Sequence, residues 1–105
     1  MLNSRQKGKV GELEFAAFLR EHGFVDARRG VQYHGGAESP DVVGIPGLHI
    51  EVKRCERGSL YAWLSQATDD AGAGKIPVVA HRRSRKQWAA ILSFENLIEL
   101  MRCRQ

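Results

Sequence analysis

The residues best suited to chemistry are two carboxylates and one ammonium group that lie close together in the chain. Asp41 is followed, after nine intervening residues, by an E-x-K triplet that contains Glu51 and Lys53. The dipeptide Pro46-Gly47 lies midway between the two acids, among β-branched and apolar residues, and this pattern predicts a turn and therefore a hairpin. In a hairpin folded about Pro46, Asp41 lies opposite Glu51.

Side chains alternate in direction along a strand, and this alternation decides which groups share a face with the acids. Directly opposed residues have Cβ atoms roughly 5 Å apart, where two like charges repel. A hard divalent cation such as Mg²⁺, held by one or two carboxylates, would remove that repulsion. The spacing is equally compatible with a surface ladder of charges, and a register shifted by one residue would separate the acids. The residues expected on one strand face are His49, Glu51, Lys53 and Cys55.

A third acid lies on a segment with helical periodicity, Asn3 to His22. Glu12 falls inside the apolar sector of that helix, between Leu19 and Ala16. An unpaired charge is expensive to bury, so Glu12 needs a partner. A salt bridge to Arg or Lys is one explanation, and a place beside the acid pair described above is the other.

These features together resemble the PD-(D/E)xK nucleases, and most closely the small Holliday junction resolvases and resolvase-like nucleases of phages and prophages. The resemblance extends over residues 5 to 100. At one position the chain differs from many relatives, which carry Tyr four residues after a characteristic Gln, where this chain has Asp70. The matching motifs are Gly8 to Glu12 (G-K-V-G-E), Pro40-Asp41, Glu51-Val52-Lys53 and Gln66 in a helix expected over Leu60 to Ala71.

The resemblance implies a role for each matching residue in metal-dependent hydrolysis of a phosphodiester, with 5′-phosphate and 3′-hydroxyl products. Asp41, Glu51 and the backbone carbonyl of Val52 would hold Mg²⁺, with Mn²⁺ able to substitute. Lys53 would orient or help deprotonate the attacking water. Glu12 would hold a second metal or a metal-bound water. Gln66 would hydrogen-bond Lys53 or the scissile phosphate.

The charge balance favours a nucleic-acid partner. Sixteen Lys and Arg against twelve Asp and Glu give a formal net charge of +4, and the excess is gathered in three clusters. Such clusters suit a phosphate backbone, where neutralising charge and releasing counterions supply much of the affinity. For the run at 81–86, a solvated loop is an equally good explanation. The candidate DNA-binding residues are Arg5, Lys7, Lys9, Arg28, Arg29, Arg82, Arg83, Arg85 and Lys86.

The expected fold is a single α/β domain over residues 1–105, because the length supports one modest core. The resemblance implies a restriction-endonuclease-like core, αβββαβ, with a central mixed sheet flanked by helices. Ser93 is a good N-cap for the last helix. The elements expected from the pattern are helices at 3–22, 60–71 and 94–102, a first strand at 24–29, the two hairpin strands, and strands at 76–81 and 88–92.

The remaining features bear on compartment and assembly. Cys55 and Cys103 lie far apart and form neither a disulfide framework nor a zinc motif. No apolar segment has the length of a signal peptide or a membrane span, so we expect a cytoplasmic protein with reduced thiols and no membrane partner. A four-way junction has two-fold symmetry and must be cut twice, so a homodimer is expected.

Three functions are compatible with these features. The leading hypothesis is a metal-dependent, structure-selective DNA endonuclease that acts on branched or four-way DNA. The second is the same nuclease core acting as a general or nicking duplex endonuclease, accessory to a phage or restriction system. The third, disfavoured because all the charged positions are present, is a non-catalytic DNA-binding module.

Overall fold

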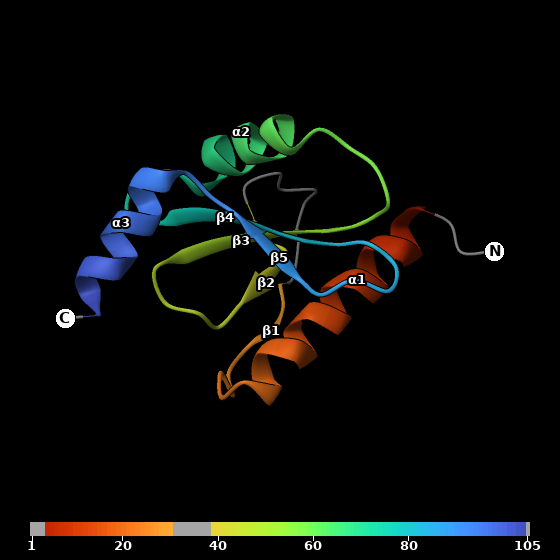
Figure 1. Ribbon diagram of the computed structural model, residues 1–105. Helices are drawn as coiled ribbons and strands as arrows, with labels where there is room; N and C mark the ends of the chain where they lie inside the picture. The colour runs from red at the N-terminus through yellow and green to blue at the C-terminus, as the bar shows by residue number, and fades with distance from the viewer. Residues whose placement is uncertain (1–3, 31–38, 105) are drawn as a thin grey trace.

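The computed structural model describes residues 4–30 and 39–104, and residues 4–7 by their backbone alone. Three helices and five strands make up these parts of the chain (Figure 1). No described helix is both long enough and apolar enough to cross a membrane. The elements in chain order are α1 (Ser4–Glu21), β1 (Arg28–Arg29), β2 (Val42–Val43), β3 (Leu48–Arg54), α2 (Leu60–Ala71), β4 (Ile76–Arg82), β5 (Ala89–Ile91) and α3 (Phe94–Cys103).

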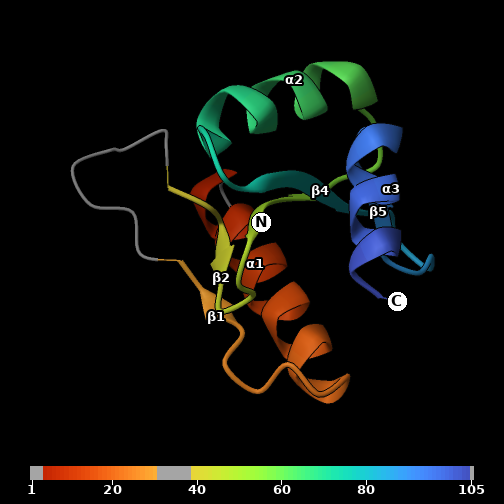
Figure 2. The same ribbon diagram turned by 90° about the vertical axis from the view of Figure 1, so that its left-hand side faces the viewer.

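The five strands form one mixed sheet in the order β1-β2-β3-β4-β5. Only β3 and β4 run parallel, and α2 makes the crossover between them; the other neighbours are antiparallel. Figures 1 and 2 show α1 on one face of the sheet, α2 on the other, and α3 beyond one end. The expected α/β class, with a mixed sheet flanked by helices, is confirmed.

The core lies mainly between α1 and the sheet. Phe15 and Ala16 of α1 pack against Val42, Ile50 and Ala80, which come from three neighbouring strands. A buried Phe side chain contributes roughly 1.5–3 kcal/mol relative to an exposed one. On the other face, Ala67 of α2 and Val79 of β4 are fully buried. Both faces of the central strands are therefore covered, as is usual for a parallel pair.

The helix ends follow local signals in the sequence. At the end of α1, Gly23 adopts φ 98° and its N–H donates to the Arg20 carbonyl at 3.1 Å, while the Phe24 N–H donates to the Leu19 carbonyl at 3.0 Å. This pair of bonds is a Schellman motif. Ser59 caps α2, and Ser93 caps α3 as predicted, accepting from the Asn96 N–H at 3.1 Å.

The first strand is the main error in the expected elements. The sequence pattern predicted a strand at 24–29, whereas β1 contains Arg28 and Arg29 alone. Phe24 is bonded into the Schellman motif, and its carbonyl accepts from the Ala27 N–H at 3.0 Å, so this stretch turns instead of extending. Smaller corrections are that α1 ends at Glu21 and that Trp88 precedes β5.

Candidate active site

The hairpin between β2 and β3 places the two acids side by side, as predicted. Val42 pairs with Ile50, the register that sets Asp41 opposite Glu51. Asp41 is fixed to β3 by two bonds: its backbone N–H donates to the Ile50 carbonyl at 2.8 Å, and its Oδ2 accepts from the Val52 N–H at 2.8 Å. The Asp41 carboxylate is thus held beside the β3 backbone within one residue of Glu51.

Glu51 lies in a cluster with two other acids, Asp41 and Asp70, whose negative charges disfavour its ionised form. Burial is the largest influence on Glu51, followed by the charge and hydrogen bond of Asp41 and then those of Asp70, and together they raise its pKa to about 9. At neutral pH the Glu51 carboxyl therefore keeps its proton in the absence of a cation. One Glu51 oxygen, Oε1, lies 2.9 Å from His49 Nε2, and the His49 side chain is 2% exposed.

Asp70 is a site residue that sequence analysis did not identify. It lies on α2 three residues after the fully buried Ala67 and seven after Trp63, whose ring contacts His81 of β4. This i, i+4, i+7 spacing turns Asp70 toward the sheet, where its charge and hydrogen bond act on Glu51. The sequence signal that could have placed Asp70 in the site is its spacing from Trp63 and Ala67 on one helix face.

Glu12 is buried as expected, at 8% exposure, and both explanations proposed for it contribute. Its Oε2 accepts from Arg29 Nε at 3.2 Å. Burial raises the pKa of Glu12 most, the charge of Asp41 raises it further, and Arg29 lowers it. Glu12 therefore lies near enough to Asp41 to feel its charge while it is paired with a cation.

Lys53 lies on β3, and Gln66 lies on α2, the helix that covers this face of the sheet. Lys53 is half-buried on β3 and pairs in register with His81 of β4. Gln66 is exposed on α2, next to the buried Ala67. In the described part of the chain no hydrogen bond joins Gln66 to Lys53, so the role assigned to Gln66 stays a prediction.

The donor atoms of the cluster fit a hard cation. Asp41, Glu51 and Asp70 offer carboxylate oxygens, and Mg²⁺ is commonly bound through one or two carboxylates plus water. Over residues 4–30 and 39–104, no group of three or more His, Cys, Asp or Glu side chains already has the arrangement of a metal site. The predicted ligation by the Val52 carbonyl also stays a prediction, because the Val52 contact with Asp41 is made by its N–H.

Several predicted DNA-binding residues have structural partners. Arg82 donates to Glu14 Oε1 at 2.6 Å and to the Lys86 carbonyl at 2.6 Å, and lies over the Trp88 ring at 6.0 Å. Arg54 donates to the same Glu14 oxygen at 3.3 Å. These contacts join α1 to β3 and β4 and give Arg82 a structural role, while its contact with DNA stays a prediction.

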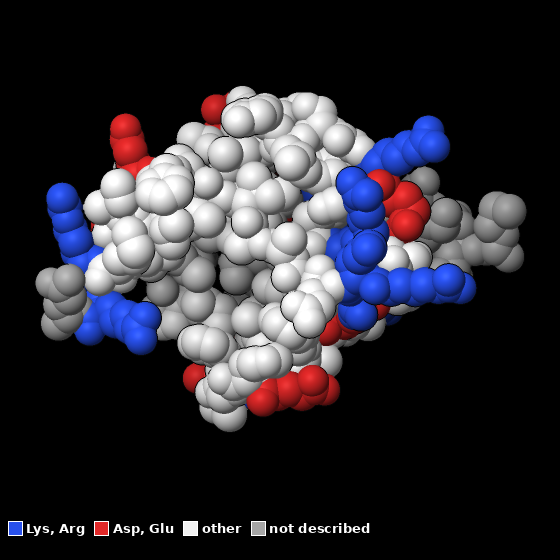
Figure 3. Space-filling view, viewed as in Figure 1, with Lys and Arg blue, Asp and Glu red and all other residues white. Residues whose placement is uncertain are grey.

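The other basic residues are more accessible. Figure 3 shows Lys and Arg at both ends of this view, one group on the side of the turn between β4 and β5 and the other beside α3. Arg28 donates to the Asp26 carbonyl at 3.2 Å, and Arg29 pairs with Glu12. The side chains of Arg5 and Lys7 lie outside the described part of the structure. The exposed members of the predicted set are Lys9, Arg28, Arg83, Arg85 and Lys86.

Comparisons of the chain with protein-family models, curated proteins and solved structures find no match.

Proposed function

We propose that the protein is a metal-dependent DNA endonuclease of the PD-(D/E)xK type, with a restriction-endonuclease-like core. The observation that carries the proposal is the convergence of Asp41, Glu51 and Asp70 in a region where burial and mutual repulsion hold a proton on Glu51. Strongly raised acid pKa values and paired carboxylates are typical of functional sites. A cation bound by Asp41 and Glu51 would take the place of that proton and offset the repulsion between the acids.

The ligands of the cation would be Asp41 and Glu51, with the Val52 carbonyl and the adjacent Asp70 completing an oxygen-rich site. When bound, a divalent cation supplies Lewis acidity and lowers the pKa of a coordinated water. Glu12, already within electrostatic reach of Asp41, would bind a water or a second cation once its pairing with Arg29 is exchanged.

The chain's own residues supply orientation and charge. Lys53 lies on β3 two residues from Glu51, so both side chains belong to the face covered by α2. Its ammonium would orient the attacking water and offset the charge that builds on the phosphoryl oxygens. The water oxygen forms a bond to phosphorus while the bond to the 3′ oxygen breaks, which leaves a 5′-phosphate and, after proton transfer, a 3′-hydroxyl.

The basic surface would bind the rest of the DNA. Arg83, Arg85 and Lys86 are exposed in the turn after β4, the strand that adjoins Glu51 and Lys53. Their charges would contact phosphates that flank the cut, where each neutralised phosphate adds to the salt dependence of binding. A four-way junction is cut at two symmetric positions, so we propose that the protein acts on it as a homodimer.

The test compares wild type with Asp41→Asn and with the matched control Asp26→Asn, whose side chain is exposed. Each protein is incubated with a labelled four-way junction and a linear duplex, in Mg²⁺ and in EDTA. Cleavage that requires Mg²⁺, survives Asp26→Asn and is lost in Asp41→Asn supports the proposal. Paired cuts in the junction alone support a resolvase, and equal cutting of both substrates supports a general nuclease. Tight binding with no cleavage by wild type would contradict the enzyme assignment.

A further inference from the structure

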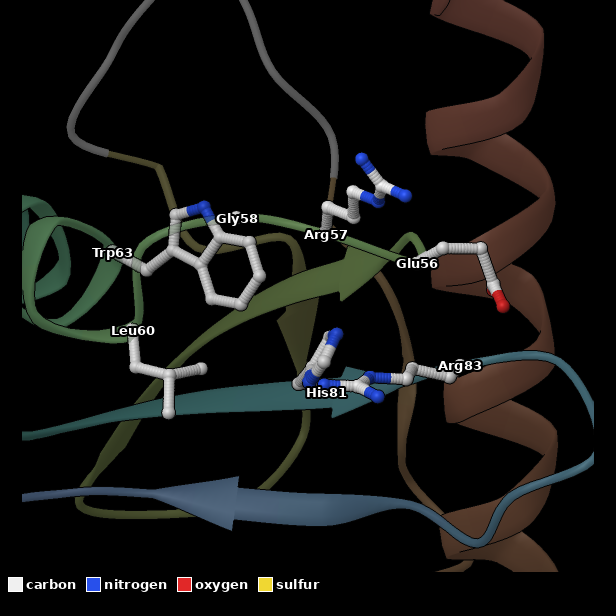
Figure 4. Close-up of a pocket in the computed structure, with 7 residues that line it drawn as sticks. All are labelled: Glu56, Arg57, Gly58, Leu60, Trp63, His81 and Arg83. Atoms are coloured by element: carbon white, nitrogen blue, oxygen red, sulfur yellow. The ribbon is translucent and has the colours of Figure 1, made fainter.

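A pocket lies on the α2 side of the sheet, beyond Lys53, and Arg83 is the one residue of its lining with a role above. Its volume is about 590 Å³, within the range of about 300–1,000 Å³ usual for ligand sites. Figure 4 shows Trp63 and Leu60 entering from the side of α2, Arg57 and Glu56 from the loop after β3, and His81 and Arg83 from β4 and its end. The pocket is therefore built from two segments that are separated in the sequence, residues 56–63 and residues 81–83.

The aromatic wall of the pocket is held in place by its neighbours. The Trp63 and His81 rings have centroids 4.9 Å apart and are tilted by 52°. His81 Nε2–H donates to the Cys55 carbonyl at 2.9 Å, which fixes the imidazole. The indole also lies so close to the loop backbone that a Cβ at Gly58 would overlap it. A ring with little freedom to move costs little entropy when a ligand stacks on it.

The charged rim of the pocket is mainly cationic. Arg57 and Arg83 are both exposed. The one acid of the lining, Glu56, is engaged elsewhere, because its Oε2 accepts from the Ser84 N–H at 2.8 Å and ties the loop after β3 to the β4–β5 turn. A second cavity of about 260 Å³ shares His81 and Arg83 and continues the groove toward Lys86. The groove thus combines an aromatic wall with three cations.

The groove is adjacent to the candidate active site. His81 pairs in register with Lys53 across the parallel strands β3 and β4, whose spacing is about 4.8 Å. A DNA strand whose scissile phosphate lies at Lys53 would reach the groove with a nucleotide close to the cut. Aromatic side chains that stack bases, combined with cations that follow the backbone, are how proteins bind single-stranded nucleic acid.

From this arrangement we propose that the groove binds an unpaired nucleotide of the cleaved DNA strand, with its base on Trp63 and its phosphate between Arg57 and Arg83. The inference rests on the proposed nuclease function and narrows its substrate class to duplex DNA that adjoins unpaired nucleotides. A base stacked inside a duplex has both faces covered by its neighbours and cannot present one to the indole, so the groove discriminates between the two kinds of DNA.

The experiment measures binding in EDTA, where no cleavage occurs, by fluorescence anisotropy. The probes are a blunt duplex and the same duplex with a single-stranded overhang that carries 2-aminopurine at its first unpaired position. The variants are Trp63→Leu and, as a matched control, Tyr61→Leu, because Tyr61 is 86% exposed on the same helix and does not line the groove. Circular dichroism verifies that each variant is folded.

We expect Trp63→Leu to weaken binding of the overhang DNA on the order of 10-fold, which corresponds to the loss of one base stack. Blunt-duplex affinity should change less than about 2-fold, which is under 0.5 kcal/mol. The 2-aminopurine fluorescence should be quenched by wild type and by Tyr61→Leu, and restored in Trp63→Leu. Equal losses on both DNAs, or no difference between the two variants, would overturn the proposal.

A second pair of variants keeps the test decisive if Trp63→Leu does not fold. Arg57→Gln lies on an exposed loop, and Arg102→Gln on α3 removes an equal charge away from the groove. Arg57→Gln should reduce the salt slope for the overhang DNA by about 0.7, the value for one phosphate of a single strand, and Arg102→Gln should not. Identical slopes would count against the groove.

The two proposals can fail separately. Overhang-selective binding that depends on Trp63, without Mg²⁺-dependent cleavage, would remove the nuclease function and leave the groove as a nucleotide-binding site. Cleavage that requires Asp41, without overhang selectivity, would support the nuclease function and contradict a role for the groove in substrate recognition.

Discussion

The sharpest prediction concerns the stability of the acid cluster and does not depend on activity. Glu51→Gln replaces a titrating carboxyl with an amide that can still donate a hydrogen bond to Asp41 or Asp70. In wild type the folded-state pKa of Glu51 lies at about 9, above the ordinary value of 4.5. Between these values the folded protein binds more protons than the unfolded chain, so the free energy of unfolding of wild type falls as pH rises.

The magnitude follows from the size of that window. While Glu51 is protonated in the folded state and ionised in the unfolded state, the slope is at most about 1.36 kcal/mol per pH unit. From about pH 6.5 to about pH 8.5 the loss is therefore at most about 3 kcal/mol. We expect about 2 kcal/mol, because the Glu51 side chain keeps 13% exposure and water lessens the effect. At the lower end of this range His49 opposes the slope, because burial lowers its folded-state pKa below the ordinary 6.5 of the unfolded chain, and the comparison with Glu51→Gln cancels this contribution.

The assay is urea denaturation in EDTA at several pH values, with wild type, Glu51→Gln and the control Glu95→Gln. Glu95 is exposed in the first turn of α3, so its variant should keep the wild-type slope. Glu51→Gln should lose most of the slope and be the more stable protein at the alkaline end. Mg²⁺ should stabilise wild type more at high pH than at low pH, because the cation replaces the proton. A wild-type slope equal to that of Glu51→Gln would refute the clustering of acids.

Three further predictions test other parts of the structure. Lys53→Ala should lower the cleavage rate on the order of 10²-fold or more with little change in DNA affinity, measured by single-turnover kinetics and anisotropy; equal losses in both would make Lys53 a simple phosphate contact. Replacing Arg83 and Arg85 together with Ala should reduce the slope of the log binding constant for duplex DNA against log salt concentration by up to about 1.8. An unchanged slope would indicate that these residues belong to a solvated loop that does not contact DNA. Gly44→Ala should destabilise the fold by more than about 1 kcal/mol in urea titrations, because Gly44 has φ 100° and a Cβ there would overlap the Asp26 carbonyl; wild-type stability would contradict the turn geometry.

Sequence patterns were enough to predict those parts of the fold that are set by residues close together in the chain. The bounds of α2 were correct because an apolar stripe follows an N-cap serine, and the β2–β3 register was correct because Pro46-Gly47 fixes the turn. The strand predicted at 24–29 was wrong because the bonds that end α1 reach into it. Apolar residues there mimic a strand, although Phe24 and Val25 are 50% and 76% exposed.

The candidate site was predictable only where its residues belong to one hairpin. Asp41 and Glu51 are related by the turn between them, so their proximity could be inferred from spacing. Asp70 comes from a separate element, and its approach to Glu51 depends on how α2 packs on the sheet. Likewise, nothing in the sequence could pair Glu12 with Arg29, because α1 and β1 meet only in the folded protein.

The distribution of charge over the molecule bears on why such a site would act on DNA. A phosphate brought to Asp41, Glu51 and Asp70 meets like charges, which oppose binding unless a cation or a proton compensates. The exposed Arg83, Arg85 and Lys86 lie beyond β4, so they can hold a DNA strand without neutralising the acids themselves. Affinity and chemistry are then supplied by different residues. Removing a site acid should consequently tighten DNA binding while it abolishes cleavage, a combination that a structural role for the acid does not produce.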